Sequence, residues 1–105
     1  MDILWLSEKD VEGLISMDAA MPLVEEAFGH LARGTAQMPP KLYLEFKEYG
    51  GDLRAMPAYI PKISCAGGRS FAGVKVVNSH PGNPQRGLPT VAAVYLGMVS
   101  CMLPF

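Results

Sequence analysis

Lys75 is the residue whose surroundings point most directly to chemistry. Val74, Val76 and Val77 flank it, so little water is left for its ammonium group. A buried lysine without a partner is costly, or else its pKa falls. Two interpretations stay open: the lysine points outward from a half-exposed strand, or it faces a pocket, where it could bind a carboxylate or polarise a carbonyl oxygen.

Arg54 is the second candidate. It follows Asp52 and precedes the apolar residues 55–58, where an arginine is out of place. Its planar guanidinium suits bidentate recognition of a carboxylate better than a lysine would. The alternative is a surface ion pair with Asp52 or Glu45, worth about 0–1 kcal/mol.

Residues 78–90 form a loop dense in Pro and Gly, which favours a fixed shape that could line a site. A lone histidine such as His80 is more often structural than catalytic, and we expect His30 to be a surface or rim residue. The sequence has no GxGxxG or GxxxxGK[ST] motif and no paired metal ligands, and the glycines of 67–73 have the wrong spacing for a dinucleotide turn. We therefore expect no bound cofactor, no metal site and no complete catalytic constellation.

Composition restricts the remaining possibilities. The 105 residues fit one domain, 18% of them are charged and the net charge is -1, which argues against nucleic-acid binding. Cys65 and Cys101 are far apart and form no CxxC motif, so we expect free thiols in a reducing compartment. Neither a signal peptide nor an 18-residue apolar run is present, and the sequence predicts a cytoplasmic protein with no membrane contact.

The first third of the chain predicts short helices that must support these residues. Residues 3–6 form an apolar run that predicts a strand, and Ser7 with Asp10 predicts a helix start, with the helix ending near Ser16. Asp18 predicts the N-cap of a second helix, with Pro22 tolerated in its first turn and Gly34 at its end.

The rest of the chain predicts a sheet. Apolar and polar residues alternate over 42–46, a Gly-Gly turn follows, and 53–59 returns as the partner strand of a hairpin. Pro57 implies an edge or a strand end. Residues 61–72 show no period and predict a loop, and further strands are expected over 73–79 and 90–96. The fold class is therefore α+β, with N-terminal helices packed on a mainly antiparallel sheet.

Several segments, in order along the chain, resemble the ornithine cyclodeaminase/μ-crystallin family, in particular its archaeal-type alanine dehydrogenases. They are SMDAAM at 16–21, VEEAF at 24–28, QMPPK at 37–41, GDLRAMPA at 51–58, GVKVVNSHPGNP at 73–84 and GLPTV at 87–91. The resemblance runs from about residue 4 to residue 95.

The resemblance implies a substrate-binding and dimerising domain that in the family precedes a Rossmann domain binding NAD(P). It implies that Lys75 lies beside the substrate carboxylate and the reacting carbon, that Arg54 holds the carboxylate, and that Lys41 and Thr90 lie near the substrate. Cyclodeaminases carry an acidic residue where Arg54 stands, so a small amino or 2-oxo acid such as alanine or pyruvate is the expected ligand. A homodimer through the sheet is also expected.

The resemblance ends near residue 95. We expect residues 1–95 to be a partial substrate-binding and dimerisation domain without its Rossmann domain, and residues 96–105 to be an aberrant tail. NAD belongs to the complete family enzyme, and we expect this chain alone to be inactive. Two alternatives stay open: a small ligand-binding or dimerisation module, and a non-functional truncated product.

Overall fold

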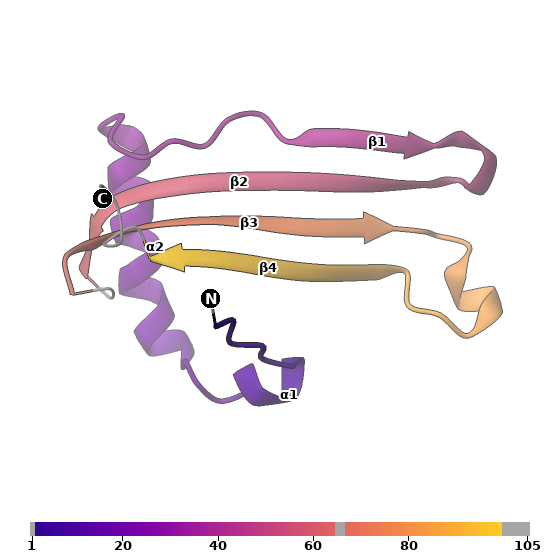
Figure 1. Cartoon of the computed structure of the whole chain (residues 1–105), viewed down its shortest axis with the longest axis horizontal. Helices are drawn as coiled ribbons and strands as arrows, with labels where there is room; N and C mark the ends of the chain where they lie inside the picture. Colours follow the sequence, from indigo (N-terminus) through magenta and orange to yellow (C-terminus); the bar gives the residue numbers. More distant parts are fainter. Residues whose placement is uncertain (1, 65–66, 100–105) are drawn as a thin grey trace.

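The structure is a computed structural model that describes residues 2–64 and 67–99. Two helices come first, and a four-stranded antiparallel sheet of order β1-β2-β3-β4 follows (Figure 1). The elements are α1 (Glu8–Val11), α2 (Met17–Ala32), β1 (Leu42–Phe46), the 3-10 turn η1 (Lys47–Tyr49), β2 (Gly51–Ile63), β3 (Arg69–Ser79), the 3-10 turn η3 (Asn83–Arg86) and β4 (Val91–Val99). The α+β class is confirmed. No helix in the described ranges is long and apolar enough to cross a membrane.

The helix caps agree only in part with the sequence prediction. The Ser7–Asp10 capping box is present, but α1 ends at Val11 and not near residue 16. The N-cap of α2 is Ser16, whose hydroxyl accepts from the Ala19 N–H at 3.1 Å, so the prediction of Asp18 was wrong by two residues. This earlier start places Pro22 sixth in α2, beyond the first turn where a proline costs nothing.

The C-terminal end of α2 is as predicted, because Gly34 follows the helix with a left-handed φ of 73°. The predicted strand over residues 3–6 is wrong. Ile3, Leu4 and Trp5 are 75%, 81% and 74% exposed and belong to no strand of the described sheet. An apolar run forms a strand only where a neighbouring strand pairs with its backbone, and here none does.

The hairpin of β1 and β2 is confirmed, with Leu42 opposite Ala55 and Phe46 opposite Gly51. The predicted loop over 61–72 is too long, because β2 extends to Ile63 and β3 begins at Arg69. The pairing shifts by one residue between Ile60 and Ile63, and Lys62 between them has a φ of 52°. This β-bulge breaks the apolar alternation from which a strand is predicted.

Pro57 lies inside β2, opposite Val74 of β3, yet it occupies a local edge as predicted. The N–H of Tyr59 donates to the Gln37 carbonyl on the β1 side at 2.8 Å. Residues two apart in a strand point their N–H groups to the same side, so the missing N–H of Pro57 also faces that side. The β1 pairing begins only at Leu42, which lies opposite Ala55, so the ladder loses no bond there.

The sheet has two unlike faces. The polar face carries Tyr43, Asp52, Arg54 and Lys75, and the apolar face carries the alternate residues. The large side chains of the apolar face include Leu42, Leu44, Leu53, Val74, Val76, Val94 and Leu96. Leu42 and Leu44 are 70% and 59% exposed, so this face is uncovered within the described residues.

Helix α2 attaches to the end of the sheet opposite the β1–β2 turn (Figure 1). The Glu26 carboxylate accepts from the Ser64 backbone N–H at 2.9 Å and from the Ser64 hydroxyl. These bonds lower the pKa of Glu26, the hydroxyl contributing most. Ile63 beside this junction is the one buried hydrophobic side chain among the described residues, with 9% exposure.

The predicted domain boundary at 95 falls within β4. Residues 96–99 continue this strand, and Leu96 lies opposite Val74. Residues 100–105, the rest of the predicted tail, lie outside the described residues. The division into residues 1–95 and 96–105 stays a prediction.

Candidate functional site

Tyr43 is the centre of a cationic cluster on the polar face. The Arg54 guanidinium carbon lies 4.9 Å from the centroid of the Tyr43 ring, and the Lys41 ammonium lies 5.6 Å from the same centroid. The strand pairing produces this contact, because Tyr43 lies directly opposite Arg54. The face of a phenol ring attracts cations, so the Tyr43 side chain contacts two of the four predicted site residues. Tyr43 itself was not predicted.

Arg54 also forms an ion pair with Asp52. Its Nε donates to Oδ1 at 3.0 Å and its Nη2 donates to Oδ2 at 2.9 Å, while the two side chains keep 32% and 21% exposure. These bonds lower the pKa of Asp52 and raise the pKa of Arg54. The ion-pair alternative is therefore present, with Asp52 and not with Glu45 as the partner. The guanidinium still keeps N–H groups for another acceptor.

Lys75 lies on the same face, one strand further on. It is half-buried and sits between Met56 of β2 and Tyr95 of β4. Arg54 pairs with Val77, so Arg54 and Lys75 are diagonal neighbours, and such residues lie about 7–8 Å apart. Within residues 2–64 and 67–99, the Lys75 ammonium has no ion-pair partner. It is therefore available to an anion beside Arg54.

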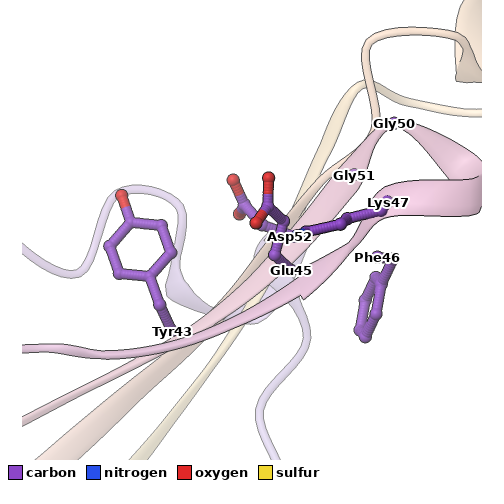
Figure 2. Close-up of a pocket in the computed structure, with 7 residues that line it drawn as sticks. All are labelled: Tyr43, Glu45, Phe46, Lys47, Gly50, Gly51 and Asp52. Carbon is purple, nitrogen blue, oxygen red and sulfur yellow. The ribbon is translucent and has the colours of Figure 1, made fainter.

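A shallow open hollow of about 670 Å³ adjoins this cluster at the β1–β2 turn. Its lining residues are Tyr43, Glu45, Phe46, Lys47, Gly50, Gly51 and Asp52. Figure 2 shows the carboxylates of Glu45 and Asp52 close together on the side of the sheet where the Tyr43 ring stands, with the Phe46 ring on the other side. Glu45 and Asp52 are directly opposite in the hairpin, so this end of the polar face is acidic.

Thr90 is the predicted site residue that the structure separates from the others. It precedes β4, five residues before Tyr95, which is about 17 Å along a strand. Its carbonyl accepts from the His80 N–H at 2.7 Å, and its side chain is exposed. Its role near the substrate stays a prediction.

His80 has the surroundings of a structural residue, as the sequence indicated. Its ring stacks on Phe46 with centroids 5.8 Å apart and an interplanar angle of 24°. Its Nδ1 lies 3.2 Å from the side-chain nitrogen of Asn78. Gly51 leaves room for the ring, because a Cβ there would lie 2.4 Å from His80 Cδ2. The ring thus fills space at the base of the β1–β2 turn.

The described residues do not fit NAD. A dinucleotide site needs a strand that leads through a glycine-rich turn into a helix, whose N-terminal N–H groups hold the pyrophosphate. Of the two described helices, α2 follows α1 directly, and the Ser16 hydroxyl already accepts from the Ala19 N–H. We assign no described residue to cofactor binding.

Three comparisons show which known proteins the chain resembles. The profile of the ornithine cyclodeaminase/mu-crystallin family matches residues 1–100. The chain is 56% identical over 96 residues to alanine dehydrogenase of Archaeoglobus fulgidus, which covers 91% of this chain and 27% of that protein. The match therefore spans about a quarter of the relative's length.

Two solved structures share the fold. One is an archaeal alanine dehydrogenase dimer with bound NAD, with a TM-score of 0.74, 55% identity, and coverage of 88% of this chain and 26% of that one. The other is Δ1-pyrroline-2-carboxylate reductase of Thermococcus litoralis with NADH and L-proline, with a TM-score of 0.77, 35% identity, and coverage of 92% and 28%.

Proposed function

The chain belongs to the ornithine cyclodeaminase/mu-crystallin family, and from this membership we propose that it is the carboxylate-binding part of an NAD-dependent oxidoreductase for a small amino or 2-oxo acid. Alanine and pyruvate are the first ligands to test. The relatives support this proposal, since one is an alanine dehydrogenase and another was solved with NADH and L-proline.

The grouping of Arg54, Lys41 and Lys75 on one face is the observation that carries the proposal. Arg54 and Lys41 contact the Tyr43 ring, and Lys75 lies diagonally across from Arg54 without an ion-pair partner in the described ranges. Three cations share this face with two carboxylates, those of Asp52 and Glu45, which leaves one positive charge in excess for an anion. Arg54 and Lys41 hold the ligand carboxylate, and Lys75 assists at the carbonyl or imine carbon.

The same charges set specificity. A ligand with a second ammonium group, such as ornithine, brings that cation toward Arg54, Lys41 or Lys75 and is rejected. An amino acid with an apolar side chain avoids this repulsion. Alanine and proline are therefore favoured over ornithine, and Thr90 stays a prediction for the wall of the pocket.

This part alone has no oxidoreductase activity in our proposal, because the described residues do not fit NAD. Its cytoplasmic location stays a prediction from the sequence. A small ligand-binding or dimerisation module remains the alternative, and it differs in requiring no NAD at any stage.

The apolar face of the sheet supports homodimerisation as part of the proposal. Leu42, Leu44, Val94 and Leu96 are each more than half exposed, and stable interfaces bury roughly 800 Å² on each partner. One relative is a dimer. Sedimentation at several concentrations should show a discrete dimer, and Leu44→Glu should convert it to monomer. A polydisperse sample with Leu44→Glu unchanged would argue against this interface.

Titration of pyruvate, L-alanine and L-ornithine into the purified chain tests ligand binding. Chemical shifts in ¹⁵N spectra report binding and confirm folding in the same sample. We expect pyruvate and L-alanine to bind, ornithine to bind less tightly, and Arg54→Gln to weaken pyruvate about 10- to 150-fold by removing a charged hydrogen-bond donor. Lys9→Gln is the matched control, because it removes one exposed cation that lies on α1 and not on the sheet. Equal affinities in the two variants would contradict the proposal.

A further inference from the structure

We propose that Asp52 and Tyr43 are positioning residues that hold the Arg54 guanidinium with its Nη1 edge open to a ligand carboxylate. The inference rests on the proposed function of Arg54 and deepens it. It concerns two residues that touch Arg54 and need not touch the ligand.

Asp52 determines which edge of the guanidinium is taken. Its two oxygens accept from Nε and Nη2, at 3.0 Å and 2.9 Å, which uses the side edge of the group. A guanidinium has five N–H donors, so the end edge formed by Nη1 and the second Nη2 hydrogen remains. Within the described ranges Nη1 donates no hydrogen bond, and the side chain is 32% exposed, so a ligand can reach it.

Tyr43 determines the tilt of the guanidinium. Its ring lies 4.9 Å from the guanidinium carbon and covers one face of the group. The side-on carboxylate and the ring below together restrict a side chain that is otherwise among the most flexible. An arginine ordered before the ligand arrives loses less freedom on binding, which favours affinity.

The direction in which ligand affinity changes when Asp52 is removed distinguishes a positioning role from competition with the ligand. If the Asp52 carboxylate occupied the place of the ligand carboxylate, its removal would raise the affinity for the ligand. The loss of a negative charge near an anionic ligand would also raise it. If Asp52 positions Arg54, its removal weakens binding even though the site becomes more positive. Asp52 neutralises the charge of Arg54 in the ion pair, and Lys41, whose ammonium lies 5.6 Å from the centroid of the Tyr43 ring, provides a further positive charge for the ligand.

The test compares Asp52→Asn with Glu45→Gln in pyruvate titrations. Glu45 lies directly opposite Asp52 on the same face, so its substitution removes the same charge but no Arg54 contact. We expect Asp52→Asn to lower the affinity for pyruvate at least about threefold, which corresponds to the loss of one ordinary hydrogen bond. Glu45→Gln should leave the affinity for pyruvate unchanged or raise it. Tyr43→Phe should bind like wild type and Tyr43→Leu should bind less tightly, since only the first keeps the ring.

The outcomes distinguish the two proposals. If Arg54→Gln loses pyruvate binding while Asp52→Asn binds pyruvate equally or more tightly, the positioning role of Asp52 is overturned. The proposed function of Arg54 then still holds. No binding by wild type overturns the proposed function, and the ¹⁵Nε signal of Arg54 then decides positioning. That signal should lie away from the Arg Nε position of the unfolded chain in wild type and Glu45→Gln, and should move to the unfolded-chain position in Asp52→Asn. An unmoved signal overturns the proposal.

Discussion

Gly51→Ala tests the packing at the base of the β1–β2 turn. The backbone of Gly51 is not left-handed, so an alanine is not excluded by conformation. Its Cβ would lie 2.4, 2.6 and 2.8 Å from Cδ2, Nε2 and Cγ of His80. Ordinary contacts begin near 3.4 Å, so the imidazole must move by the 1.0 Å between 2.4 and 3.4 Å. The ring cannot then keep its place on Phe46.

The free-energy cost comes from two interactions of the His80 ring. The Phe46–His80 stack contributes about 0.5–1.5 kcal/mol, and a hydrogen bond between His80 and Asn78 contributes a similar amount. We expect Gly51→Ala to destabilise the fold by about 1–3 kcal/mol, the usual range for overpacking. With an m value of ~2 kcal/mol/M, the urea midpoint falls by about 1 M.

Urea unfolding of two further variants makes the result specific. Gly82→Ala is the matched control, because Gly82 has a φ of -81° and no atom lies within 4 Å of its added Cβ. It should unfold like wild type. His80→Ala combined with Gly51→Ala should cost less than the two changes added together. An unchanged midpoint in Gly51→Ala, or simple additivity in the double variant, would refute the packing of His80 over Gly51.

Three other predictions concern the helices and their junction with the sheet. Ser64→Ala removes the main cause of the low pKa of Glu26, so NMR titration should find that pKa closer to its ordinary value. Because a lowered carboxyl pKa stabilises the fold above the unfolded pKa and the contribution is lost as pH falls through the folded pKa, Ser64→Ala should also lose less stability on acidification than wild type. Ser16→Ala should cost about 0.5–2 kcal/mol in urea unfolding and Asp18→Ala less, since only Ser16 caps α2; the reverse order would restore Asp18 as the cap. Pro22→Ala should stabilise the chain by about 2 kcal/mol, because it restores an N–H inside α2, and a lower thermal midpoint would show that the ring of Pro22 has a packing role.

The sequence predicts the parts of the fold where local pattern and tertiary context agree. Alternation over β1 and the left-handed glycines Gly34 and Gly50 are local signals, and the structure follows them. The choice between Ser16 and Asp18 as a cap is not decided by residue type, because both accept hydrogen bonds. The bulge at Lys62 conceals the hairpin of β2 and β3, since one extra residue reverses the faces that alternation assigns.

The sequence indicates the cationic residues of the candidate site, but it does not indicate which residues contact them. Lys75 and Arg54 stand out because charged residues interrupt apolar runs. Which carboxylate Arg54 binds depends on side-chain reach, and Asp52 and Glu45 are equally plausible from spacing. Tyr43 was missed because its place in the alternation is that of an ordinary polar-face residue. Counting strand register back from the Gly50 turn would have placed it opposite Arg54.

The bulge at Lys62 also divides the β2–β3 pairing into two parts that tolerate sequence changes differently. From Asp52 opposite Ser79 to Ile60 opposite Phe71 the pairing is continuous, and this stretch holds Arg54 and Lys75 in fixed register. Beyond the bulge, the Ile63–Arg69 pair connects to that stretch through an already irregular ladder. Sequence changes at this pair can therefore accumulate during evolution, or be engineered, without moving the two cations relative to each other.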